Sequence, residues 1–163
     1  MKRARAQSRA GGAIGAVDVL CTVAGAPPAA RVEAWTRVLL SKAGAKRPLS
    51  LSVLLCGDRR MRTLNKTWRR KDRSTDVLSF PSLEESSSSR SSSFLGDLVI
   101  DVPYATRQAR RRGHAVSREI QILLAHGLLH LLGYDHETDD GKMFRLQRRL
   151  VVVAFGGGPD GVP

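Results

Sequence analysis

The stretch SREIQILLAHGLLHLLGYDH, residues 117–136, decides the fold because it combines a long apolar run with three histidines. Leucine, isoleucine and alanine cover nearly every helical face between 117 and 132, so the sequence predicts a helix there that is buried on almost all sides. Ser117 is the expected N-cap, Glu119 lies in the first turn, and Gly133 is placed to end the helix in a left-handed conformation. We therefore expect a fold built around one central, histidine-bearing helix.

The three histidines follow the spacing HxxxHxxGxxH. His126 and His130 are four residues apart and share a helix face, while a turn at Gly133 can bring His136 back beside them. A single histidine on an apolar helix is usually a hydrogen-bonded core residue, but two imidazoles stacked among leucines would cost about 1–3 kcal/mol for each unpaired nitrogen. Three nitrogen ligands are typical of zinc, and three rather than four leave a coordination position open for chemistry. The sequence predicts one catalytic zinc ion per chain, bound by His126, His130 and His136.

Gly127, which follows the first of these histidines, argues against one class of zinc enzyme. The metzincin proteases share the histidine spacing, but in their signature, HExxHxxGxxH, a glutamate at this position is the general base. Glycine offers no group that could deprotonate a zinc-bound water. The chain is therefore expected to keep the metal ligands of such a site without its peptide-cleaving chemistry.

The charge of the chain favours a polyanionic partner. The 163 residues carry a formal net charge of +12. Residues 58–73 hold eight basic side chains against two acidic ones, and residues 106–118 hold five arginines and no acid. One such tract is often only a solvated helix face, but two of them beside an open metal site favour an RNA or DNA backbone over an anionic membrane surface. Trp68 in the first tract could stack on a base, although a core tryptophan is the preferred interpretation.

The hydrophobic pattern is of the α+β type, within one domain. Strands are expected at residues 16–24, 49–56, 75–81 and 94–102, and helices at 29–41, 59–68, 104–112, 117–132 and 142–152. The strands at 75–81 and 94–102 flank a serine tract and could pair as neighbours. Cys21 and Cys56 both fall in apolar strand-like runs, which predicts buried free thiols in a reducing compartment.

The two ends and the serine tract differ from this ordered part. Residues 1–16 are expected to be a disordered basic extension, 17–154 the functional domain with a solvated serine-rich loop at 86–93, and 155–163 a flexible tail. The extension lacks the apolar region of a secretion signal, so we expect a cytoplasmic protein, with an organellar transit peptide as the alternative. No window approaches the roughly 18–20 apolar residues that a membrane-spanning helix needs, and no membrane partner is expected.

Three blocks in the same order, LNKTWRRKDRSTDVLSFP, LGDLVI and HGLLHLLGYDH, resemble the YbeY family of single-strand-type, zinc-dependent endoribonucleases over about residues 50–150. This resemblance implies an α+β fold with a small mixed sheet, zinc on His126, His130 and His136, and Arg69 as a catalytic or phosphate-binding residue. It also implies a role in ribosomal RNA processing at the 3′ end of 16S rRNA and in ribosome quality control. The expected partners are rRNA in the ribosome or a small-subunit precursor, with ribosomal proteins or an assembly GTPase.

Several alternatives stay open. Asp135, next to His136, is a candidate general base, but a structural contact within the turn is an equal possibility. A non-catalytic, zinc-stabilised rRNA-binding assembly factor would carry the same ligands and charge. A metal hydrolase acting on a small molecule would share the metal site, but its affinity for substrate should hardly depend on salt.

Overall fold

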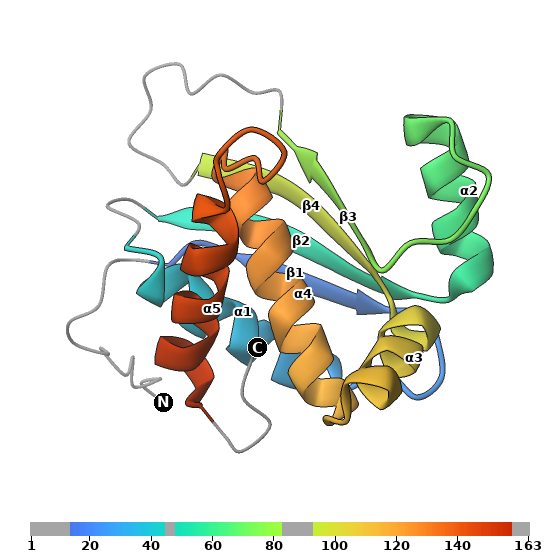
Figure 1. Cartoon of the computed structure of the whole chain (residues 1–163), viewed down its shortest axis with the longest axis horizontal. Coiled ribbons are helices and arrows are strands. Elements are labelled where there is room, and N and C mark those ends of the chain that lie inside the picture. Colours follow the sequence, from blue (N-terminus) through green and yellow to red (C-terminus); the bar gives the residue numbers. More distant parts are fainter. Residues whose placement is uncertain (1–13, 45–47, 83–92, 158–163) are drawn as a thin grey trace, which may run out of the picture.

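A four-stranded sheet organises the chain, and its helices pack around that sheet (Figure 1). The structure is a computed structural model that describes residues 14–44, 48–82 and 93–157. Its elements in chain order are β1 (Val17–Cys21), α1 (Ala29–Lys42), β2 (Leu49–Cys56), α2 (Asp58–Arg69), β3 (Val77–Pro81), β4 (Ser93–Asp101), α3 (Val102–Arg112), α4 (Val116–Leu131) and α5 (Lys142–Phe155).

The sheet is mixed, with the strand order β1-β2-β4-β3. β1 pairs with β2 and β2 pairs with β4 in parallel, whereas β3 runs antiparallel to β4 with Leu78 opposite Val99 and Phe80 opposite Asp97. The predicted pairing of the two stretches that flank the serine tract is therefore confirmed, as is the expected α+β fold with a small mixed sheet. β3 is an edge strand, so no further strand of this sheet covers the surface beside it.

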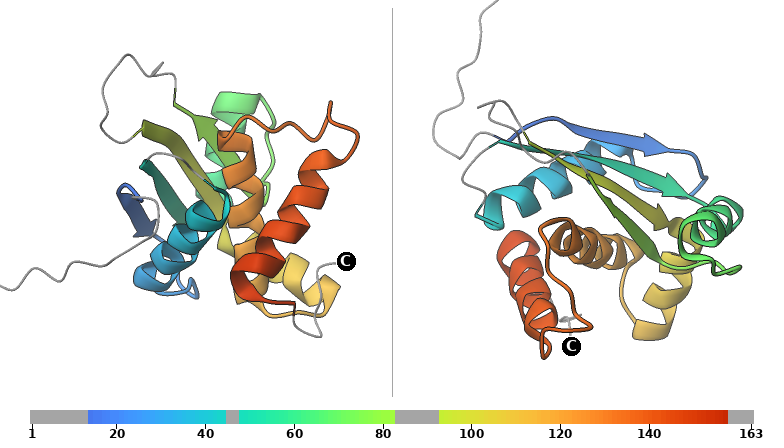
Figure 2. Two further views of the ribbon diagram at one scale, coloured as in Figure 1. Left: turned by 90° about the vertical axis from the view of Figure 1, so that its left-hand side faces the viewer. Right: turned by 90° about the horizontal axis from the view of Figure 1, so that it is seen from above.

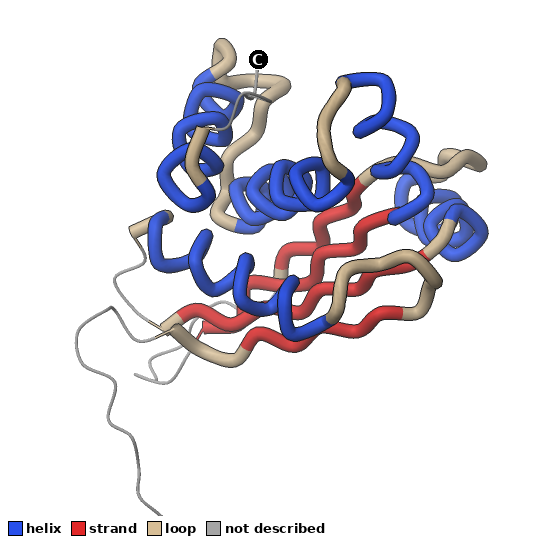
Figure 3. Tube along the Cα trace, turned by 90° about the horizontal axis from the view of Figure 1, so that it is seen from below, coloured by secondary structure: helices blue, strands red, loops and turns tan. Residues whose placement is uncertain are grey.

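The two faces of the sheet have different covers. α1, α4 and α5 lie together on one face (Figures 2 and 3), where Leu98 and Ile100 of β4 join the main core. Leu78 and Val99 have the opposite parity and point to the other face, because successive residues of a strand alternate. There they form a smaller cluster with Met61 of α2. α2 and α4 consequently lie on opposite faces of the same two strands.

Gly127 lets α4 approach the sheet closely. A Cβ at this position would lie 2.7 Å from Cδ2 of Leu98 and 3.2 Å from Oγ of Ser79, closer than side chains normally pack. The glycine therefore faces the sheet, and its neighbour His126 is turned to a different side of the helix. A glutamate at 127 would have to displace both Leu98 and Ser79, which strengthens the argument against a protease.

Three local predictions for α4 can be compared directly with the structure. Gly133 has a φ of 91°, which confirms the left-handed end of the helix, and Glu119 lies in the first turn as expected. Ser117 as the N-cap is wrong: the helix starts at Val116 after Ala115, without a side-chain cap hydrogen bond. The physical reason is tertiary, since Val116 packs against the main core and the first turn starts two residues earlier than a Ser117 N-cap would allow.

Trp68 is also placed differently from its preferred interpretation. Its side chain is 67% exposed, so it is not a core tryptophan. The two cysteines are free, as predicted, with Cys56 buried and Cys21 partly buried. Burial raises the pKa of the Cys56 thiol to about 11, so this thiol stays protonated and is no candidate nucleophile or ligand.

The packed part of the chain extends slightly past the expected bounds of 17–154. Gly15 donates its backbone N–H to the carbonyl of Leu49 at 3.0 Å, and α5 continues to Phe155. Gly15 therefore adjoins the sheet and Phe155 belongs to a helix that packs on it. The composition around these two residues could not indicate these contacts. Most of the predicted extension at 1–16, the serine tract apart from Ser93, and residues 158–163 of the predicted tail lie outside the described residues.

Within the described ranges, no helix combines the length and apolar character required to cross a membrane.

Candidate functional site

Three histidines converge at the end of α4. His126 and His130 project from successive turns of the helix, and His136 comes from the loop that follows Gly133. One ring nitrogen from each residue lies within 4.8 Å of those of the other two, so the three side chains could hold a metal ion. The Nε2 atoms of His126 and His130 are 3.1 Å apart. The structure thus brings together the three residues predicted as ligands.

Gln147 orients the first of these histidines. Nδ1 of His126 donates a hydrogen bond of 2.8 Å to Oε1 of Gln147, which is buried on α5. Because an amide oxygen only accepts, the proton must sit on Nδ1, and the lone pair of Nε2 is left to face the other imidazoles. A hydrogen bond to the second ring nitrogen is the usual way in which proteins orient a histidine ligand.

Sequence reasoning missed Gln147, although a signal was present. The buried face of α5 consists of Met143, Gln147, Leu150 and Val151. A single glutamine on an otherwise apolar helical stripe requires a buried hydrogen-bond partner. The pattern alone could have marked Gln147, but it could not have identified His126 as the partner.

Burial keeps the imidazoles in the state that binds metals. Burial lowers the pKa of His126 more than its hydrogen bond to Gln147 raises it, and burial together with the neighbouring imidazoles of His126 and His136 lowers the pKa of His130. Burial disfavours the charged form, so both rings are neutral at pH 7 and keep a free lone pair. The donor set therefore fits a metal ion in chemistry as well as in position.

Two further residues border the histidines. The ring of Phe144 on α5 lies 5.1 Å from that of His136 and 6.2 Å from that of His126, and it is exposed to solvent on one side. Asp135 has its carboxylate engaged with the backbone N–H of Glu137 at 3.0 Å, within the same turn. This contact supports a structural role for Asp135 within the turn.

Arg69 is the last residue of α2 and is exposed. Among the described residues its side chain makes no hydrogen bond or ion pair, so none links it to the histidines. Its neighbour Trp68 touches Phe80 of β3, while Ser79 donates a hydrogen bond of 3.4 Å to the carbonyl oxygen of Gly127 on α4. The end of α2 and the histidine end of α4 therefore flank the same part of β3.

The two basic tracts form the exposed surfaces of α2, the turn after it and α3. Some of their charge is neutralised internally: Arg62 and Lys66 both pair with Asp72, and Arg107 pairs with Asp58. The hydrogen bonds from Arg62 and Lys66 lower the pKa of Asp72 to about 2, so this carboxylate stays ionised. Exposed basic residues for which the described part of the chain provides no acidic partner include Arg59, Arg60, Arg69, Arg70, Lys71, Arg73, Arg110 and Arg111.

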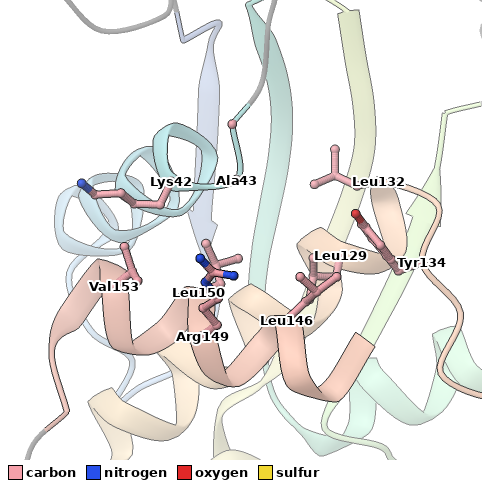
Figure 4. A pocket seen from close by; sticks show the side chains of 10 residues that line it. Lys42, Ala43, Leu129, Leu132, Tyr134, Leu146, Arg149, Leu150 and Val153 are labelled. Carbon is pink, nitrogen blue, oxygen red and sulfur yellow. The ribbon is translucent and has the colours of Figure 1, made fainter. Parts of the chain in front are cut away.

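A hollow elsewhere is not part of this site. It lies between the end of α1, α4 and α5 and has a volume of about 530 Å³ (Figure 4). Four leucines and a valine line it, together with Lys42, Tyr134 and Arg149 among others. None of the three histidines lines it, and its ionisable groups are poor metal ligands.

Comparison with known proteins decides the family. A family model described as endoribonuclease YbeY matches residues 25–153. The chain belongs to this family. An endoribonuclease YbeY from Aquifex aeolicus is 45% identical over 117 residues, which cover 71% of this chain and 75% of the relative. An endoribonuclease YbeY from Anaeromyxobacter dehalogenans is 49% identical over 113 residues, which cover 69% of this chain and 56% of that relative. The family resemblance of the three sequence blocks is therefore confirmed.

A solved structure has a similar fold. The solution structure of TM1509 from Thermotoga maritima matches with a TM-score of 0.57 and 26% sequence identity, covering 86% of this chain and 90% of that one. The family model spans the histidine cluster, Gln147 and the whole of α2, so the candidate site lies within the part of the chain that matches the YbeY family.

Proposed function

We propose that this protein is a zinc-dependent endoribonuclease that cleaves single-stranded RNA. The observation that carries the proposal is the convergence of three imidazoles, in a chain of the endoribonuclease YbeY family that also carries two basic tracts. His126, His130 and His136 would hold one zinc ion. When bound, zinc would act as a Lewis acid toward a phosphoryl oxygen and lower the pKa of water toward about 7.

The chain's own residues supply the remaining parts of the proposed mechanism. Gln147 holds His126 in the tautomer that directs Nε2 toward the cluster. Arg69 donates charge-assisted hydrogen bonds to the phosphate of the substrate, which gain strength as negative charge grows in the transition state. Its exposure and its lack of an ion-pair partner among the described residues support this role, because the guanidinium is free to bind the substrate.

We further propose ribosomal RNA as the substrate, in the maturation of the 3′ end of 16S rRNA and in ribosome quality control in the cytoplasm. The exposed basic residues of α2 and α3 that have no acidic partner within residues 14–44, 48–82 and 93–157 support a polyanionic substrate rather than a small molecule. Ribosomal proteins or an assembly GTPase are the proposed partners, by resemblance to the family.

The test starts from the purified full-length protein. Its metal content is measured, and cleavage of a structured rRNA fragment is followed before chelation, after chelation and after zinc is restored. We expect one zinc per chain, with cleavage that is lost and regained together with the metal. Zinc without metal-dependent cleavage would favour the non-catalytic assembly factor, and a protein that binds no metal would contradict the site.

A second measurement separates RNA from a small-molecule substrate. The affinity for RNA is determined at increasing salt, since each neutralised phosphate of a single strand contributes about −0.7 to the slope of log K against log salt. A steep slope is expected. A flat one would argue for a metal hydrolase that acts on a small molecule.

A further inference from the structure

Trp68 occupies an unusual position at the end of α2. It continues the helical stripe of Met61, Leu64 and Asn65, which faces the sheet, and this pattern explains why a core position was expected. The stripe extends beyond the core, however, because β3 is the edge strand of the sheet. The indole touches Phe80 edge to face, with ring centroids 5.8 Å apart, and remains 67% exposed.

The turn after α2 holds this indole in place. Arg70 adopts a left-handed conformation with a φ of 58°, and its N–H donates to the carbonyl of Lys66. The buried Asn65 donates a hydrogen bond of 2.8 Å from its side chain to the carbonyl of Arg73. Two side-chain ion pairs to Asp72 close the same turn. The indole is thus presented by an anchored segment, which lowers the entropy cost of binding a ligand on it.

The charges around Trp68 indicate the kind of ligand. Arg69, Arg70, Lys71 and Arg73 follow it closely in the chain, all are exposed, and none has an acidic partner among the described residues. An exposed aromatic ring beside a row of unpaired cations matches a single-stranded nucleic acid, in which bases and phosphates alternate. Membership of an endoribonuclease family favours RNA over a protein or lipid as this ligand.

The edge strand β3 contacts both this surface and the histidine-bearing helix α4. Phe80, which contacts the indole, is the strand neighbour of Ser79, whose hydroxyl contacts Gly127, which is adjacent to His126. In Figure 1, α2 and α4 stand on either side of β3. A strand of RNA whose base rests on Trp68 therefore lies beside the edge strand that separates it from the metal ligands.

We propose that Trp68 is a stacking platform for one unpaired base of the substrate, with Arg70 and Lys71 binding the adjoining phosphates. This inference rests on the proposed function, because it takes RNA as the substrate. It adds a requirement that the three histidines and Arg69 do not impose: the nucleotide that enters this subsite must be out of any duplex. Trp68 acts in binding the substrate and takes no part in the bond cleavage.

The first test is kinetic. Trp68→Ala, Trp68→Tyr and the control Leu20→Ala are compared on a single-stranded RNA; Leu20 is 62% exposed on β1, at the opposite edge of the sheet. Loss of one stacked base should raise KM by about 5- to 150-fold, corresponding to 1–3 kcal/mol at 1.4 kcal/mol per tenfold, with kcat nearly unchanged. Tyrosine should restore most of the loss, and Leu20→Ala should behave as the parent. If RNA is cleaved and Trp68→Ala leaves KM unchanged, the platform is wrong while the proposed function stands.

The second test observes the indole directly. The chain has two tryptophans, so Trp68 is the sole indole in a Trp35→Phe background. Titration with RNA in the presence of a chelator should quench its fluorescence, and RNAs with an abasic site at one position at a time should show one position that removes the quenching. An abasic site at that position should lower the RNA affinity of the parent but not that of Trp68→Ala, because stacked partners are energetically coupled. If quenching is the same for every position of the abasic site, the stacking is overturned. If a protein partner loses affinity in Trp68→Ala and RNA does not, this surface belongs to another class of ligand.

The two failures are distinguishable. If the wild-type protein does not cleave RNA but Trp68 is still quenched by one particular base, the endoribonuclease assignment fails and the subsite survives as an RNA-binding site. If RNA neither quenches Trp68 nor binds, the subsite is overturned whatever the metal site does.

Discussion

The histidine end of α4 and the C-terminal end of α2 carry the two halves of the proposed chemistry in opposite environments. His126 is shielded, hydrogen-bonded to Gln147, and held on a helix that packs against the sheet through Gly127. Trp68 and Arg69 are exposed on a helix that extends past the edge strand. Partial burial favours the neutral form of His126 and His130, which a metal ion would need, whereas groups proposed to bind a large polyanion need access. Substitutions in the two regions should therefore fail in different ways.

The largest effect is expected from His130→Ala. Loss of one ligand should reduce cleavage by at least about a thousand-fold, because a catalytic metal contributes several kcal/mol to the transition state and each 1.36 kcal/mol is tenfold in rate. Alanine favours the helix, so circular dichroism should show an intact fold. RNA affinity should stay within about threefold of the parent at constant salt. A variant that keeps full cleavage would remove the histidines from the chemistry.

The next effect concerns Arg69. Arg69→Ala should lower kcat by about 100- to 1000-fold, the range measured when one donor to a developing charge is removed. Arg69→Lys should recover only part of this, because lysine keeps the charge and loses the planar fork. Arg59 is an exposed arginine in the first turn of the same helix, so Arg59→Lys is the matched control and should cleave RNA like the parent. Equal rates for Arg69→Lys and the parent would contradict the assigned role.

A smaller effect is expected at Gln147, which accepts the hydrogen bond from His126. Gln147→Leu removes the acceptor of His126 and should weaken zinc affinity about 10- to 100-fold, as is usual for such partners. Gln147→Glu keeps an acceptor at the same place and should retain affinity. Competition with a chromophoric chelator measures both, and Gln121→Leu, on the first half of α4, controls for loss of a glutamine elsewhere. A normal zinc affinity in Gln147→Leu would show that packing alone orients His126.

The smallest effects are expected at Arg70, after the C-terminal end of α2, where charge and backbone strain can be separated. Arg70→Gly should stabilise the fold by about 1 kcal/mol, because glycine adopts the left-handed conformation without the penalty of other residues. The same variant should flatten the salt dependence of RNA binding by about 0.7 if Arg70 binds one phosphate. Arg70→Ala should show the second change and not the first. Thermal unfolding and RNA titrations at several salt concentrations measure the two effects separately.

Most of the fold could be predicted from the sequence, and the exceptions share one cause. β2 has the predicted bounds, α1 differs at one end by a single residue, and α4 carries its histidines as the periodicity required. The start of α4 at Val116, in place of a capped Ser117, and the exposure of Trp68 were predicted wrongly. Both depend on what lies opposite the residue in space: the core packs against Val116, while the sheet ends beneath Trp68.

The same distinction holds for the candidate site. The positions of His126 and His130 follow from a four-residue spacing and the helical period, so the sequence by itself determined that two imidazoles share a face, and the glycine at 133 allowed the third to return. Only the tertiary structure decided that Gln147 of α5 contacts His126, that Arg69 is exposed at the end of α2, and that Trp68 contacts Phe80 of the edge strand. The physical reason is range: periodicity and backbone conformation act between near neighbours in the chain, whereas these contacts join elements that meet only when the sheet and its core have formed.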